Sequence, residues 1–381
     1  MPRHYRNYWK PCAPRSCNPL LVFIIFIIFV MAQNLVFTND VTSALNTILD
    51  TTPHNRVAVI VDENTRRCVL PEIDSPHLRD AAIITIGAGD AYKNLNTLSQ
   101  VWEGLQACGA TRKSIVVNLG GGVVTDLGGF AAATFKRGIK FVNVPTTLLS
   151  AVDAAVGGKT GINFGGLKNE IGCFQEATHV VISTCFFSTL PVEELKSGYA
   201  EMLKHGMLSG EEEFRQLLDF DFEHADAEQL LQLLRTSVLV KQRIVAEDPH
   251  EKGIRRALNL GHTVGHAFES KALHDDKPIA HGYAVAWGLV AEMVLSHNLL
   301  GFSSTQLHQL AEFVYHNYGA FHITCDHYEE LLHLMQHDKK SEAGEINCTL
   351  LAACGDVKPG QVIPEEEMRI ALDIYRDLMH I

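Results

Sequence analysis

Histidines with regular spacing carry the clearest chemical signal in the sequence. The segment GHTVGH places His262 and His266 four residues apart, so a helix through it would present both imidazoles on one face. His281 follows, and Glu201 stands upstream on another expected helix. One carboxylate with two imidazoles is the ligand set of a catalytic Zn²⁺ that keeps a coordination position open for substrate. The residues alone leave open which two of the three imidazoles would bind.

A glycine-rich segment is the second signal. GGGVVTD, residues 120–126, directly follows the apolar run SIVVNL. A strand that turns through glycines into a helix lets backbone N–H groups approach a pyrophosphate at the helix N-terminus. Thr125 stands where a GxGxxG pattern has its third glycine, so a plain tight turn is an equally good interpretation. Asp126 would either bond a cofactor amide or favour the start of the helix.

Cationic and amide side chains form the third signal. GKT at residues 158–160 resembles the end of a P-loop, but Asp153 replaces its first glycine, so we reject that motif. Lys159, Lys168 and Asn169 still suit phosphate or hydroxyl groups. A second group, near the histidines in sequence, suits a polyhydroxylated acid phosphate: Lys204, Lys241, Arg243, Glu251, Arg255 and Asn259. The alternative for each lysine or arginine is an ordinary solvent-exposed charge.

Short apolar runs in the first half predict the strands that would position these groups. They are Val57–Asp62, Ala82–Ile86, Ser114–Leu119, Lys140–Val144 and His179–Ser183, and Leu95–Cys108 has helical spacing between the second and third. Strands alternating with helices imply a parallel α/β sheet.

Beyond Pro191 the pattern becomes helical. We expect helices over Val192–His205, Glu211–Asp219, Ala227–Ala246, Ala257–Ala272, Ala284–Leu300 and Thr305–Tyr318, with a short strand at Ile346–Leu351. The sequence therefore predicts three segments: a leader at 1–32, an α/β domain at 33–190 and a helical domain at 191–381.

Composition narrows the function classes. The chain has 381 residues and a net charge of −12, and an acidic protein is a poor general partner for nucleic acid. Nine scattered cysteines are typical of a reduced, cytoplasmic protein. The apolar run Leu20–Ala32 behind a basic stretch is short for a membrane span. We favour translation from Met31. If translation starts at Met1 instead, the run would be an inner-membrane tether or a signal-peptide core.

Taken in order, several motifs resemble the 3-dehydroquinate synthase family of sugar-phosphate cyclases. They are GGGVVTD, FKRGIKFVNVPTTLLSAVDAAVGGKTGIN, LKNEIGCF, LPVEELKSGYAEMLKHG, LNLGHTVGHAFE and HGYAVAWG, and the match runs from about Val57 to about Lys340. The resemblance implies an amino-terminal NAD-binding, Rossmann-like α/β domain, then an α-helical metal- and substrate-binding domain, with the active site in the cleft. It implies conversion of 3-deoxy-D-arabino-heptulosonate 7-phosphate to 3-dehydroquinate and phosphate in the shikimate pathway, with catalytic NAD and Zn²⁺ or Co²⁺.

The resemblance also assigns roles to residues by motif. The metal ligands would be Glu201, His262 and His281. Cofactor contacts would be Asp62, Asn64, Asp90, Lys93, Gly121, Gly122, Val123, Asp126, Thr146, Thr147, Lys168, Phe186, Thr189 and Glu194. Substrate contacts and catalysis would fall to Asp153, Lys159, Asn169, Lys204, Lys241, Glu251, Arg255, Asn259 and His266, with His266 transferring protons. Lys339 or Lys340 would also approach the substrate.

Arg137 would reach the phosphate in a neighbouring subunit, which implies a homodimer. Two other enzyme classes share these features: a sister cyclase acting on sedoheptulose 7-phosphate or forming an inosose, and an NAD- and metal-dependent polyol dehydrogenase. The cations Lys241 and Arg255, with Asn259, favour a substrate that carries a carboxylate, and hence the synthase. A non-enzymatic regulatory protein is the remaining alternative.

Overall fold

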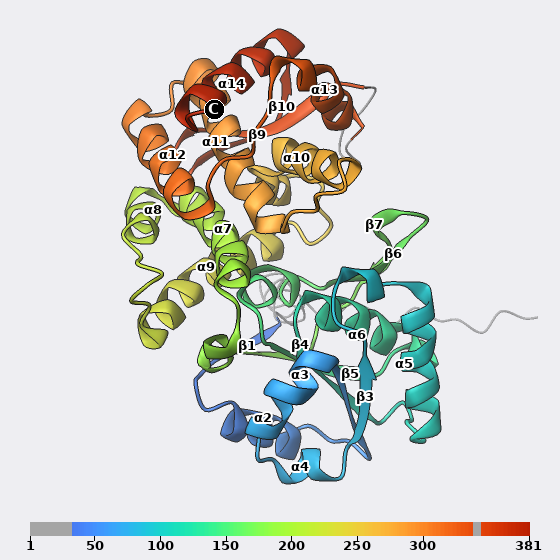
Figure 1. Cartoon of the computed structure of the whole chain (residues 1–381). Coiled ribbons are helices and arrows are strands. Elements are labelled where there is room, and N and C mark those ends of the chain that lie inside the picture. Colours follow the sequence, from blue (N-terminus) through green and yellow to red (C-terminus); the bar gives the residue numbers. More distant parts are fainter. Residues whose placement is uncertain (1–32, 338–343) are drawn as a thin grey trace, which may run out of the picture. The chain divides into compact units, whose positions relative to one another are not determined.

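A computed structural model describes residues 33–337 and 344–381 (Figure 1). The leader and the pair Lys339 and Lys340 lie outside these residues. Residues 33–381 form one compact unit. Within the described part of the chain, no helix is both long and apolar enough to cross a membrane.

A six-stranded parallel sheet organises the first half, in the order β1-β8-β5-β4-β2-β3. Its strands are β1 Asn34–Phe37, β2 Val57–Asp62, β3 Ala82–Ile86, β4 Ile115–Gly120, β5 Lys140–Pro145 and β8 His179–Ile182. Five of these were predicted within a residue or two of their observed bounds. β1 was missed, because four residues at the sheet edge make a weak apolar signal.

Helices cover both faces of this sheet, because its central strands carry apolar side chains on both faces. In β2, Val57, Val59 and Val61 pack on one side and Ala58 and Ile60 on the other. The first side is covered by α2 Val41–Thr51, α3 Glu63–Cys68 and α4 Pro76–Arg79, and the second by α5 Leu95–Ala107 and α6 Gly122–Thr134.

The segment between β5 and β8 forms a π-helical turn and an antiparallel hairpin. The turn, η4, covers Ser150–Ala154, and the hairpin pairs β6 Lys159–Phe164 with β7 Leu167–Phe174. Figure 1 shows β6 and β7 as a projecting ribbon. The sequence did not predict this hairpin, because most of its β7 side chains are exposed and give no apolar pattern.

The second half is mainly helical, as predicted. Its helices are α7 Val192–Ser209, α8 Glu211–Leu218, α9 Ala227–Glu247, α10 His262–His274, α11 His281–Leu300, α12 Ser304–Tyr318, α13 Tyr328–Gln336 and α14 Glu365–Leu378. It is not purely helical, because β9 Ile346–Ala353 pairs antiparallel with β10 Asp356–Ile363. The predicted start of the helix expected over Ala257–Ala272 was wrong. Gly261 has a φ of 78° and separates a short turn, Ile254–Asn259, from α10.

Candidate active site

The predicted cofactor residues gather at the carboxyl edge of the parallel sheet. β3 and β4 lie on opposite sides of β2, so the strand order reverses between β2 and β4. Open α/β sheets bind ligands outside the carboxyl ends of their strands at such a point. At this edge of the sheet lie the residues at or after the end of each strand: Asp62 at the end of β2, Asp90 and Lys93 after β3, Gly121, Gly122, Val123 and Asp126 after β4, Thr146 and Thr147 after β5, and Phe186 and Thr189 after β8.

In the turn between β4 and α6, the backbone of Gly121 lies beside Thr147 with no side chain between them. Gly121 is the N-cap of α6, and a Cβ atom there would lie 3.2 Å from Cγ2 of Thr147. The exposed N–H groups of the helix start and the close packing of β5 fit an anionic group at this turn.

Lys93 joins two predicted site residues that are distant in sequence. Its ammonium lies 2.5 Å from a carboxylate oxygen of Asp126 and 2.5 Å from the side-chain oxygen of Asn169. Burial raises the pKa of Asp126 above its ordinary value, although Lys93 opposes the shift. Asn169 has a φ of 52°, an uncommon conformation for a residue with a side chain.

Lys241 and Asp153 form a second pair that joins the two halves. Nζ of Lys241, on α9, donates to Oδ1 of Asp153 at 2.7 Å and to the Asp153 carbonyl at 2.5 Å. Burial favours the neutral acid, but the Lys241 ammonium outweighs it and holds the pKa of Asp153 below its usual range. Asp153 lies in the π-helical turn, a distortion that is frequent at functional sites.

Four further predicted substrate residues lie in or contact the region of the short turn η6, Ile254–Asn259. Lys159 pairs with Glu251, and Glu251 accepts from Nδ2 of Asn259 at 3.4 Å. Glu251 has a φ of 56°, the same left-handed region as Asn169. Arg255 is buried and donates to the carbonyl oxygens of Pro249 and Gly157, at 2.6 and 3.1 Å.

Glu201, His262 and His281 converge from three helices. Their ligand atoms lie within 4.8 Å of one another. Nε2 of His262 is 3.3 Å and Nε2 of His281 is 3.5 Å from Oε1 of Glu201. That oxygen is buried and has no hydrogen-bond partner among the described residues, while Lys204 pairs with the other oxygen, Oε2. A buried carboxylate oxygen facing two imidazole nitrogens fits a divalent cation between them.

The other nitrogen of each imidazole has an acceptor. Nδ1 of His262 lies 3.0 Å from the carbonyl of Leu260, and Nδ1 of His281 lies 3.2 Å from Oε2 of Glu269. Such acceptors keep the hydrogen on Nδ1 and leave the Nε2 lone pair free to bind a metal. Glu269 was not among the predicted residues.

Burial disfavours the charged form of each of these three groups, and whether the neighbouring charges outweigh it decides the direction in which the pKa shifts. Burial lowers the pKa of His262 to about 4, although Glu201 opposes the shift. For His281, burial is outweighed by Glu201 and Glu269, which raise its pKa to about 9. Burial would raise the pKa of Glu201, but Lys204 and His262 hold it well below the usual range. The carboxylate is therefore ionised.

His266 lies beside the other two histidines. Its ring centroid is 5.3 Å from that of His262 and 5.8 Å from that of His281. The helix α10 thus presents His262 and His266 together, as their spacing predicted.

Three further predicted residues are placed by the elements that carry them. Arg137 precedes β5, so it lies toward the amino edge of the sheet, and its φ is 69°. Asn64 lies in the first turn of α3, directly after β2 at the carboxyl edge, and its side chain accepts from Arg67. Glu194 is exposed in the first turn of α7.

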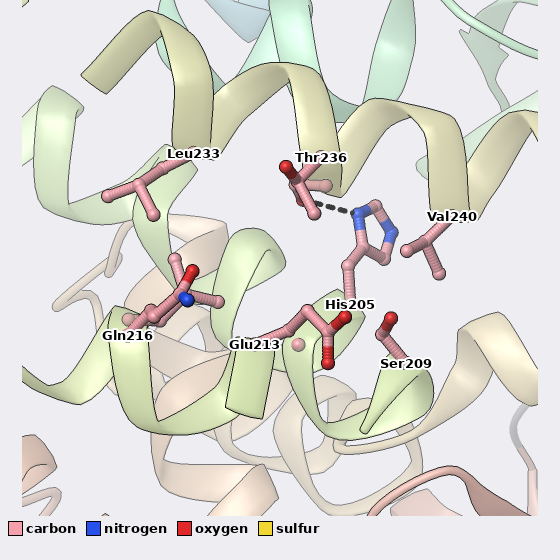
Figure 2. A pocket seen from close by; sticks show the side chains of 10 residues that line it. His205, Ser209, Glu213, Gln216, Leu233, Thr236 and Val240 are labelled. Atoms are coloured by element: carbon pink, nitrogen blue, oxygen red, sulfur yellow. Dashed lines mark hydrogen bonds between the residues drawn. The ribbon is translucent and has the colours of Figure 1, made fainter. Parts of the chain in front are cut away.

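A small cavity between α7, α8 and α9 borders this site through His205, which has a ring nitrogen within 4.8 Å of a carboxylate oxygen of both Asp153 and Glu201. Figure 2 shows His205, Glu213 and Gln216 in its lining. The lining also includes Ser237, and it contains none of the predicted residues. Nδ1 of His205 lies 2.9 Å from Oγ of Ser237, and burial, with the nearby Lys204 charge, lowers the pKa of His205 to about 3. His205 is therefore a neutral, buried imidazole.

Two family models cover most of the chain. The model described as 3-dehydroquinate synthase N-terminal matches residues 83–197, and the one described as 3-dehydroquinate synthase C-terminal matches 198–341. A 3-dehydroquinate synthase of Parabacteroides distasonis is 46% identical over 346 residues, which cover 91% of this chain and 98% of that protein. The chain belongs to the 3-dehydroquinate synthase family. A family member from Pyrococcus abyssi is 41% identical and covers 74% of this chain and 82% of its own length.

Solved structures share the fold at low identity. The 2-epi-5-epi-valiolone synthase of Streptomyces hygroscopicus, solved with NAD⁺ and Zn²⁺ bound, has a TM-score of 0.80 at 23% identity and covers 97% of this chain and 99% of its own. A 2-deoxy-scyllo-inosose synthase, complexed with carbaglucose-6-phosphate, NAD⁺ and Co²⁺, has a TM-score of 0.77 at 21% identity and covers 91% and 96%. These likenesses support the predicted fold class.

Proposed function

We propose that this member of the 3-dehydroquinate synthase family converts 3-deoxy-D-arabino-heptulosonate 7-phosphate to 3-dehydroquinate and phosphate, as a carbon–oxygen lyase of the shikimate pathway. The observation that carries the proposal is the buried Oε1 of Glu201, which faces the Nε2 atoms of His262 and His281. This cluster is linked to the β6–β7 hairpin by the pair of Lys168 with Glu269.

In this proposal, Glu201, His262 and His281 hold Zn²⁺ or Co²⁺, and the residues at the sheet edge hold NAD. The donor set and the glycine turn fit both groups, and two structural neighbours were solved with NAD⁺ and one of these metals. When bound, NAD would accept and return a hydride at the substrate C5, and the cation would polarise the neighbouring oxygens.

The chain's own residues would bind the substrate and move its protons. Lys159, Asn169 and one of Lys339 and Lys340 would hold the phosphate through charge-assisted hydrogen bonds. Lys204, Lys241, Arg255 and Asn259 would orient the carboxylate and hydroxyl groups, with Asp153 and Glu251 accepting hydrogen bonds. His266 would transfer protons beside the cation without binding it, because three protein ligands and one open position suffice for a catalytic metal.

The organisation around this site is also part of the proposal. We take 33–190 and 191–381 as the two domains, and the cytoplasm as the place of action. Arg137 of the partner subunit would complete the phosphate site in a homodimer. Its position toward the amino edge of its own sheet favours a role outside its own cofactor site.

The test supplies the purified protein with 3-deoxy-D-arabino-heptulosonate 7-phosphate, catalytic NAD and Zn²⁺, and follows inorganic phosphate and NADH absorbance together. We expect stoichiometric phosphate and 3-dehydroquinate with no lasting NADH. Zinc-loaded protein that releases no phosphate from this substrate, but does so from sedoheptulose 7-phosphate, would indicate a sister cyclase. Steady accumulation of NADH with simple polyols would indicate a dehydrogenase.

A further inference from the structure

Glu269 bridges a predicted metal ligand and the β6–β7 hairpin. It lies on α10, and its side chain is only 14% exposed. Its two carboxylate oxygens have different partners: Oε1 lies 2.5 Å from Nζ of Lys168, and Oε2 lies 3.2 Å from Nδ1 of His281. We propose that Glu269 is a positioning residue that fixes His281 for cation binding and couples it to Lys168. This inference rests on the proposed function.

The first step concerns the orientation of His281. Its Nε2 faces Oε1 of Glu201 at 3.5 Å, so this nitrogen must carry the lone pair if a cation lies between them. Nδ1 must then carry the hydrogen, and Glu269 is its acceptor. A carboxylate acceptor holds the ring in place and increases the basicity of the opposite nitrogen.

The second step is a comparison with His262. Its Nδ1 donates to the neutral carbonyl of Leu260, which belongs to the same short segment of chain. His281 instead depends on a charged side chain from a different helix. Removal of Glu269 would therefore leave the His262 arrangement intact and free only the His281 ring.

The third step concerns Lys168. It extends from β7, and its side chain is 55% exposed, so an anionic ligand at the hairpin can reach it. While Lys168 pairs with Glu269, it withdraws negative charge from the carboxylate that supports His281. An anion that draws Lys168 away from Glu269 would leave the full negative charge of the Glu269 carboxylate to interact with His281. Occupancy of the anion and cation sites would then be positively coupled, and the coupling is reciprocal.

The experiment measures Zn²⁺ affinity by competition with a chromophoric chelator, and the visible spectrum of the Co²⁺-loaded protein. We expect Glu269→Ala to weaken Zn²⁺ binding by roughly 10- to 100-fold and to alter the Co²⁺ spectrum. Glu269→Asp, which keeps the charge, should recover part of the affinity and shows whether a loss reflects misfolding. Lys168→Met should bind Zn²⁺ as tightly as the unaltered protein or more tightly.

Glu330→Gln is the matched control. Glu330 pairs with Lys271 and His274, also on α10, but is not among the partners of His281. Glu330→Gln should leave the Zn²⁺ affinity and the Co²⁺ spectrum unchanged. A folded Glu269→Ala protein with unchanged Zn²⁺ affinity and an unchanged Co²⁺ spectrum would overturn the inference, even if the enzyme makes 3-dehydroquinate. Suppose instead that Glu269→Ala weakens Zn²⁺ binding but the unaltered, zinc-loaded protein releases no phosphate. This result would sustain the inference and reject the proposed reaction.

Discussion

Gly282 on α11 packs directly against Ser197 on α7. The Gly282 amide donates to Oγ of Ser197 at 3.2 Å, and a Cβ atom on Gly282 would overlap the Ser197 carbonyl oxygen. His281 directly precedes Gly282, and Glu201 lies one turn beyond Ser197. The missing side chain at Gly282 therefore allows these two helices to bring His281 beside Glu201.

Gly282→Ala should separate the two helices. We expect the free energy of unfolding to fall by about 1–3 kcal/mol, because a new methyl group meets packed backbone. Zn²⁺ affinity should fall as well, since His281 moves with α11. Urea denaturation and chelator competition measure the two effects. Ser197→Ala removes only the hydroxyl, so it should retain the Zn²⁺ affinity; equal behaviour of the two variants would count against the packing argument.

Metal content should distinguish the histidine that binds Zn²⁺ from the histidine that transfers protons. His262→Ala should lose bound Zn²⁺ and activity together. His266→Ala should keep one Zn²⁺ per chain while activity falls by about 10²- to 10⁴-fold, the usual contribution of general acid–base catalysis. Metal analysis after dialysis, alongside the phosphate assay, measures both quantities. Loss of Zn²⁺ from His266→Ala would assign this residue to the ligand set.

The buried pair of Lys93 and Asp126 should matter for stability as well as binding. Their side chains are 8% and 17% exposed, and removal of one partner leaves a buried, uncompensated charge. We expect Lys93→Met to lower the free energy of unfolding by about 3–5 kcal/mol. Arg79→Met, which breaks the exposed pair with Asp74, should cost less than about 1 kcal/mol. Similar losses in the two variants would contradict this prediction.

The described cysteines should differ in reactivity. Burial, with the nearby Glu211 charge, raises the pKa of Cys354 to about 12, and the thiolate is the reactive form. Cys354 should therefore resist iodoacetamide at pH 8, while the exposed Cys325 is alkylated. Peptide mass mapping after timed alkylation measures both sites. Because the thiolate fraction of a group with so high a pKa increases about tenfold per pH unit, labelling of Cys354 should increase steadily as the pH is raised above 8. Labelling at the rate of Cys325 at pH 8 would show this prediction wrong.

The sequence predicted the parallel strands well because their burial on both faces produces continuous apolar runs. It did not predict the β6–β7 hairpin, whose exposed side chains give no such pattern. Glu269 was missed for a related reason: its partners, Lys168 and His281, are distant in sequence, and one of them lies on that hairpin. The extra length of the helix expected at Ala257 came from apolar spacing that continues through Gly261.

Paired charges were also hidden from the sequence. Lys241 and Arg255 remain predicted substrate residues, but the sequence did not indicate that Lys241 contacts Asp153 or that Arg255 bonds two backbone carbonyls. Spacing along one chain identifies groups that share a helix face, such as His262 and His266. It does not identify pairs that form only when separate elements pack together.

The strand order has a consequence for the nascent chain. Among the described strands, β1 pairs only with β8, which ends at Ile182, so the first strand to leave the ribosome waits for the last strand of its sheet. At about 5–20 residues per second, that interval is roughly 7 to 30 s. Once β5 has been made, its edge that β8 will occupy is also open. Slow translation between β1 and β8 would therefore prolong the exposure of unpaired strand edges to other chains.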